Sequence, residues 1–62
     1  MCEAKAFLVT DDHEEEIMRD VVLLQPEGEN FVLINLLGEQ KIVRGNIKRI
    51  DFLKHTIVLE KK

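Results

Sequence analysis

The chain has 62 residues, of which 45% are hydrophobic, 34% are charged and 5% are aromatic, and its net charge is −3. A chain this short forms a single domain, residues 1–62, which excludes a Rossmann unit joined to a substrate domain and a solenoid of several repeats. Apolar runs such as residues 21–24 and 31–34 are too short to cross a bilayer, and the polar start of the chain is unlike a signal peptide. We therefore expect a cytoplasmic protein that does not enter a membrane.

The first half of the chain predicts strands separated by polar turns. Residues 4–9 predict a first strand, which ends at the polar residues 10–13. Residues 14–18 predict a second strand, although three successive glutamates would also suit the start of a helix over residues 14–23. Residues 21–25 predict another strand, and Pro26 with Gly28 predicts the hairpin turn that follows it.

The second half continues in the same way. Residues 31–37 are apolar on both faces, as expected of a central strand, and Gly38-Glu39 predicts a two-residue turn directly after it. Residues 40–44 and 47–52 predict two strands with a turn at Gly45-Asn46 between them. A turn at 53–55 and a final strand at 56–60 complete the chain.

Strands with a spacing of about ten residues and tight turns predict an all-β fold. We expect a small SH3-like antiparallel barrel of five or six short strands, closed or nearly closed, because closure hides strand edges that would otherwise template aggregation. The three phenylalanines, Phe7, Phe31 and Phe52, lie in apolar segments and are expected in the core.

The sequence contains few of the motifs that are typical of enzyme active sites. Each glycine stands alone, so there is no glycine-rich phosphate loop, and serine is absent. His13 and His55 are too far apart in sequence for the histidine pair of a metalloprotease helix, and the acidic run at residues 11–16 lacks the spacing of a calcium loop. We therefore predict a protein without catalytic activity.

Charge is distributed unevenly along the chain. Residues 1–30 contain two basic and nine acidic residues, whereas residues 31–62 contain seven basic and three acidic ones. An RNA-binding module is therefore one hypothesis, in which a basic stripe faces phosphates and includes Lys41, Arg44, Lys48 and Arg49. The absence of Tyr and Trp weakens this hypothesis, because base stacking needs exposed aromatic side chains.

The single cysteine, Cys2, lies beside the N-terminus, where a thiol is available as a soft metal ligand. Removal of Met1 would give Cys2 a free α-amine, so that its nitrogen and thiolate close a five-membered chelate. Two such N,S pairs related by a two-fold axis would form a square-planar set that suits Ni(II) or Cu(II). From the residues alone, a thiol without a function is the alternative.

Five segments of the chain resemble the CooT-type small nickel-binding proteins, a family that has also been labelled as predicted RNA-binding proteins. These segments are Met1-Cys2-Glu3-Ala4-Lys5, Glu14-Glu15-Glu16 followed by Met18 and Asp20-Val21, Leu36-Leu37-Gly38-Glu39, residues 45–51 and residues 57–60. The family has an aromatic residue where this chain has Leu37. The resemblance implies a cytoplasmic SH3-like homodimer that binds one Ni(II) between its subunits through Cys2. It also implies a link to maturation of nickel-containing carbon monoxide dehydrogenase, and hence a metalloenzyme client.

The sequence therefore predicts a small metal-binding homodimer, with Cys2 as the metal ligand and Ni(II) as the metal. An RNA-binding module and a plain dimerisation module are the alternatives.

Overall fold

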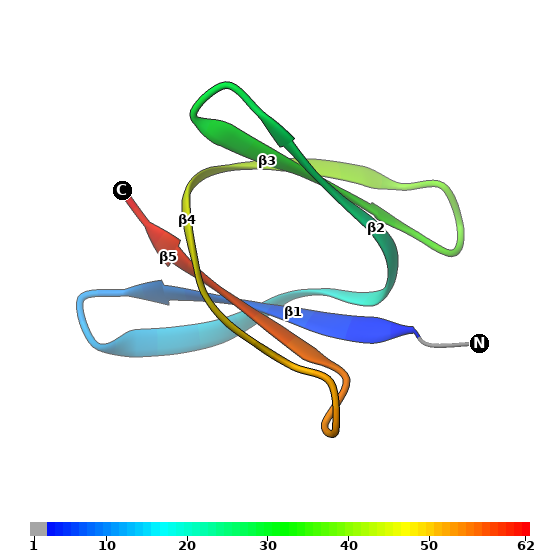
Figure 1. Cartoon of the computed structure of the whole chain (residues 1–62), viewed down its shortest axis with the longest axis horizontal. Coiled ribbons are helices and arrows are strands. Elements are labelled where there is room, and N and C mark those ends of the chain that lie inside the picture. The colour runs from blue at the N-terminus through cyan, green and yellow to red at the C-terminus, as the bar shows by residue number, and fades with distance from the viewer. Residues whose placement is uncertain (1–2) are drawn as a thin grey trace.

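The computed structural model describes residues 3–62, which form five strands and no helix. The strands are β1 (Ala4–Thr10), β2 (His13–Glu27), β3 (Asn30–Asn35), β4 (Gln40–Asp51) and β5 (Thr56–Lys61). They are hydrogen-bonded in chain order into a closed barrel (Figure 1). The all-β class is confirmed, and the helical alternative over residues 14–23 is wrong, because β2 spans that segment.

Closure of the barrel depends on one parallel pair. Consecutive strands are antiparallel, whereas β1 and β5 run in the same direction, with Lys5 opposite Thr56 and Val9 opposite Glu60. Five strands that alternate in direction form an odd number, so the first and the last must be parallel when the ring closes. The expected antiparallel barrel is thus joined by a single parallel seam among the described strands.

Two long strands bend and change partners. The first half of β2 pairs with β1 and its second half with β3, while β4 pairs through residues 40–44 with β3 and through residues 45–51 with β5. The predicted interruptions after Met18 and at Gly45-Asn46 are therefore wrong, because both segments remain in strands. Register shifts between Val21 and Leu23 and between Ile47 and Arg49 produce the bends instead, as bulges do at the corners of small barrels.

Gly45 makes the bend in β4 sterically feasible. A Cβ atom at this position would lie 2.1 Å from the backbone oxygen of Glu60 on β5. The two backbones therefore approach each other more closely than any residue with a side chain would allow.

The core is formed by inward-facing residues contributed by all five strands: Ala6, Val21, Leu33, Val43, Ile57 and Leu59. Phe31 packs against this cluster, and Phe7 is half-buried. Phe52 is 83% exposed, so its predicted place in the core is wrong. It lies beyond the end of β4, in a turn that Asp51 closes by accepting a hydrogen bond from the Lys54 amide at 3.0 Å. Residues 3–62 contain no helix that could span a membrane.

Candidate metal site and two surface grooves

Cys2, the predicted metal ligand, lies outside the described residues, but the structure shows what surrounds the start of β1. Ala4 pairs with Val21 on β2 and packs against the core. The Lys5 amide donates a hydrogen bond of 2.9 Å to the carbonyl of His55 in the β4–β5 turn. The first strand is thus fixed between the bend of β2 and the last turn of the chain.

An apolar groove of about 260 Å³ borders this end of β1. It lies between the second half of β2 and the junction of β4 with β5. We define the apolar groove by its lining residues, which are Ala4, Val21, Val22, Leu23, Leu24, Ile50, Asp51, Phe52, His55, Thr56 and Ile57. Several of its large hydrophobic side chains, including Phe52, face solvent rather than the core. Sequence reasoning missed this groove, because it expected Phe52 in the core.

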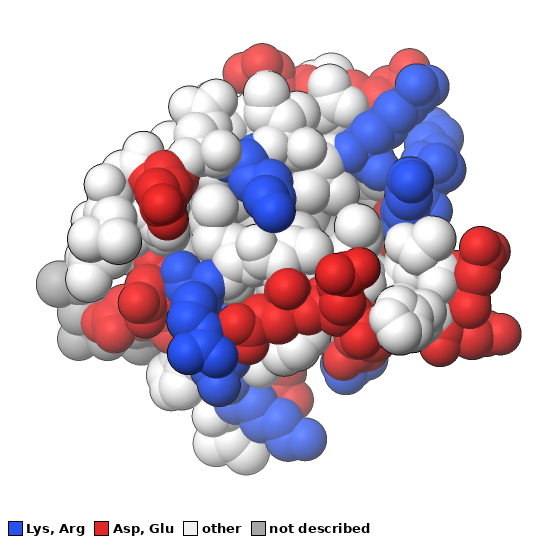
Figure 2. Space-filling view, turned by 180° about the vertical axis from the view of Figure 1, so that it is seen from behind, with Lys and Arg blue, Asp and Glu red and all other residues white. Residues whose placement is uncertain are grey.

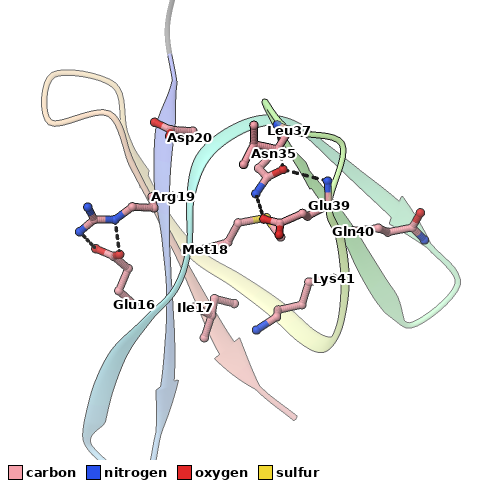
Figure 3. A pocket seen from close by; sticks show the side chains of 10 residues that line it. All are labelled: Glu16, Ile17, Met18, Arg19, Asp20, Asn35, Leu37, Glu39, Gln40 and Lys41. Carbon is pink, nitrogen blue, oxygen red and sulfur yellow. Dashed lines mark hydrogen bonds and ion pairs between the residues drawn. The ribbon is translucent and has the colours of Figure 1, made fainter.

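A second, charged groove of about 630 Å³ lies between the bend of β2 and the β3–β4 turn (Figure 3). We define the charged groove by its lining residues, which are Glu16, Ile17, Met18, Arg19, Asp20, Asn35, Leu37, Glu39, Gln40 and Lys41. On its rim, Arg19 Nε donates to Glu16 Oε2 at 2.8 Å. This hydrogen bond lowers the pKa of the Glu16 carboxyl and raises the pKa of the Arg19 guanidinium.

Asn35 organises the wall of the charged groove. Its side chain is largely buried, and Oδ1 accepts hydrogen bonds from the amides of Leu37 at 3.1 Å and Glu39 at 2.9 Å. Its Nδ2 donates to Glu39 Oε1 at 2.6 Å, as the dashed lines in Figure 3 show. These bonds close the β3–β4 turn, which explains why β3 ends at Asn35 and not at the predicted residue 37. The polar side chains of this wall are therefore occupied with holding the fold.

The other residues considered for metal binding are not brought together. Within residues 3–62, no group of three or more His, Asp or Glu side chains is arranged to hold a metal ion. His13 begins β2, His55 lies in the last turn, and the acidic residues 11–16 are exposed. The described part of the chain thus supplies no cage of oxygen ligands for a hard cation.

The predicted basic stripe is divided on the surface. Lys41 lines the charged groove, and Arg44 lies 3.7 Å from Glu29, which also binds Lys62 at 3.1 Å. Lys48 lines a separate hollow together with acidic residues, and Arg49 is exposed further along β4. Figure 2 shows acidic side chains beside basic ones on the face of the molecule that it draws. Phosphates would therefore meet carboxylates along the line on which the RNA hypothesis depends.

The chain is therefore a small β-barrel protein, and its candidate metal ligand, Cys2, precedes the first strand in the sequence. The family model described as CO dehydrogenase accessory protein CooT matches residues 1–60, and the chain belongs to this family. The protein assigned as CooT in Carboxydothermus hydrogenoformans, whose crystal structure is known, is 39% identical in sequence to this chain. The two folds superpose with a TM-score of 0.90 over 98% of each chain. The resemblance noted from the sequence segments is thereby confirmed.

Archaeal relatives match over a shorter part of the chain. An uncharacterized protein of Methanocaldococcus jannaschii is 35% identical over 46 residues, which cover 74% of this chain and 81% of the relative. An uncharacterized protein of Archaeoglobus fulgidus is 40% identical over 43 residues, which cover 69% of this chain and 96% of the relative.

Proposed function

We propose that this protein binds Ni(II) through Cys2, with one metal ion held between two copies of the chain, and that it serves the maturation of a nickel-containing metalloenzyme. The observation that supports this most strongly is the family match, which begins at residue 1 and so includes Cys2. The family is described as an accessory to CO dehydrogenase. We further propose that the protein acts in the cytoplasm and has no catalytic activity of its own.

The chemistry of Cys2 fits a carrier of nickel. A thiolate and an amine on the same residue form a compact chelate, and two chelates satisfy the square-planar preference of Ni(II). Both donors must lose a proton before they bind, because the unperturbed pKa of a thiol is about 8.5 and that of an α-amine is about 7.7–8.0. Nickel binding should therefore weaken as the pH falls below neutrality. A site of this kind releases its cargo through protonation or ligand exchange.

The described residues around the site support this assignment in two ways. The hydrogen bond from the Lys5 amide to the His55 carbonyl fixes the start of β1, the strand that follows Cys2 in the sequence. The carboxylates of the charged groove that hold partners, Glu16 and Glu39, are engaged by Arg19 and Asn35. Residues 3–62 also contain no group of three or more His, Asp or Glu side chains arranged to hold a metal ion, so competing sites among them are weak.

Isothermal titration of Ni(II) into the metal-free protein tests the proposal. We expect Cys2→Ser to abolish tight binding, whereas the control His13→Gln, a change at an exposed imidazole, should leave the affinity unchanged. Circular dichroism should show that both variants keep the β fold. Unchanged affinity in Cys2→Ser, or loss of binding in His13→Gln, would contradict the assignment of the metal to Cys2.

A further inference from the structure

We propose that a basic hollow beside an unpaired edge of β4 binds an extended, acidic segment of a partner protein. The basic hollow has a volume of about 350 Å³ and adjoins the charged groove, with which it shares Ile17 and Lys41. We define it by three basic residues, Lys41, Arg44 and Lys61, and by the aliphatic side chains that line it with them. The proposal goes beyond the proposed function, because it involves neither Cys2 nor a metal ion.

The apolar lining of the basic hollow continues the core to the surface. Leu8 and Ile17 are half-buried and pack against the core cluster, to which Val43 belongs. Ile42, the neighbour of Val43, is 58% exposed and also lines the hollow. An aliphatic side chain of a partner would remove these groups from water, which favours binding.

The ionisable side chains of the basic hollow all carry positive charge. Arg44 lies 3.7 Å from Glu29, whereas no ion pair among residues 3–62 engages Lys41 or Lys61. Figure 3 shows the end of the Lys41 side chain directed toward Ile17 on β2. Two cations are therefore available beside apolar surface, a combination that is complementary to a carboxylate carried next to an aliphatic side chain.

The edge of β4 beside the hollow is open. Residues 40–43 pair with β3 on one side, and the pairing with β5 on the other side begins only at Gly45. The Arg44 carbonyl faces the β5 side, where it accepts a hydrogen bond from the Lys62 amide at 3.3 Å. Because the backbone groups of alternate residues face the same side of a strand, the amide and carbonyl of Ile42 also face this side, where none of the described strands pairs with them.

The hollow and the open edge together favour an extended acidic segment. A strand added at an open edge gains backbone hydrogen bonds, and side-chain hollows beside the edge select alternate residues of the added strand. Carboxylates of such a segment would meet Lys41 and Lys61, and its aliphatic side chains would cover Leu8 and Ile17. A second copy of the chain fits poorly, because a two-fold contact would place the cations of one hollow against those of the other.

A single-stranded nucleic acid is less well matched to this surface. The hollow has no aromatic lining residue on which a base could stack. Glu29 lies beside Arg44, and the net charge of the chain is −3, so a polyanion that extended beyond the hollow would meet repulsion.

NMR titration of the isotope-labelled, metal-free protein tests the proposal, with a short peptide of alternating valine and glutamate as the probe. Amide shifts should change at Leu8, Ile17 and Ile42 and stay constant at residues 21–24 of the apolar groove. A peptide of alternating valine and lysine should leave all of these shifts unchanged. The valine–glutamate peptide with N-methylated backbone amides should also fail to bind, because it cannot donate hydrogen bonds to the edge of β4.

Lys41→Glu should raise the dissociation constant of the valine–glutamate peptide by about fivefold or more. Lys48→Glu is the matched control, because Lys48 is an exposed lysine of the same strand outside the hollow and its substitution changes the net charge equally. It should leave the dissociation constant nearly unchanged. Thermal unfolding establishes that both variants are folded.

Four results would overturn the proposal. These are unchanged shifts at Leu8, Ile17 and Ile42 with the acidic peptide, equal weakening by Lys41→Glu and Lys48→Glu, equal binding of the N-methylated peptide, and equal binding of a single-stranded oligouridylate at the same amides. None of these measurements includes nickel, so they leave the assignment of the metal to Cys2 as it stands.

Discussion

The apolar groove and the charged groove are openings of the same kind in one barrel, and they differ in the side chains that line them. Both lie where a bent strand, β2 or β4, has a neighbouring strand on only one side along half of its length. In the charged groove the polar side chains bind one another, since Asn35 donates a hydrogen bond to Glu39 and Arg19 donates one to Glu16. The apolar groove has few such partners. The fold thus creates both openings, and the chemistry of the lining side chains makes one of them apolar and the other charged.

Gly45, where β4 approaches β5 most closely, is the position whose substitution should have the largest effect. We expect Gly45→Ala to lower the free energy of unfolding by about 3 kcal/mol, because the new Cβ would meet the Glu60 backbone oxygen, which cannot move aside as a side chain can. Urea denaturation measures the change.

Gly28→Ala provides the matched control for this prediction. Gly28 has a φ of 64°, and an added Cβ would have no neighbouring atom within 4 Å, so only backbone strain opposes the substitution. A loss of about 1 kcal/mol is expected. Equal losses at the two glycines would show that the close approach of β4 and β5 does not determine the bend.

Asn35→Ala should loosen the charged groove and leave the apolar groove unchanged. The substitution removes the acceptor of the Leu37 and Glu39 amides, which should cost about 1–3 kcal/mol of the free energy of unfolding. Amide hydrogen exchange should increase in the β3–β4 turn and stay constant at residues 21–24. Asn46→Ala, at an exposed asparagine of β4, should change neither property. Faster exchange at residues 21–24 would show that the two grooves are coupled.

Arg19→Gln should have the smallest effect on stability, because its ion pair with Glu16 lies on the rim in contact with solvent. The substitution should instead change the pKa of Glu16, which should rise toward its ordinary value when the hydrogen bond from Arg19 is lost. A carboxyl whose pKa is lowered by folding stabilises the fold above its unfolded pKa, and this contribution disappears as the pH falls. NMR titration of the glutamate side chains measures the shift. An unchanged Glu16 pKa would mean that the pair does not form in solution.

Local sequence patterns were sufficient for much of the fold. Alternating apolar residues and the turn residues at 11–12, 28–29 and 53–55 predict an all-β barrel, and the structure confirms it. The continuity of β2 and β4 was not predictable in this way, because residues that break a strand also form bulges within one. At Gly45, the close approach to Glu60 can be seen only when β4 and β5 are placed together.

The candidate site was predictable to a different extent. Cys2 stands out in the sequence because it is the only cysteine and lies beside the N-terminus. Phe52 was misassigned, because an apolar residue at the end of a strand has the same local pattern whether it faces the core or solvent. The position of Asn35 at the end of β3 gave no local sign that it would close a turn. Each of these differences depends on contacts between strands that are distant in sequence.

Native mass spectrometry of the protein loaded with Ni(II) tests the central claim most directly, because it reports removal of Met1, the number of chains and the number of metal ions together. The account predicts one Ni(II) per two chains in the wild-type protein and a metal-free dimer in Cys2→Ser. One Ni(II) per single chain, or a Cys2→Ser dimer that retains the metal, would contradict it.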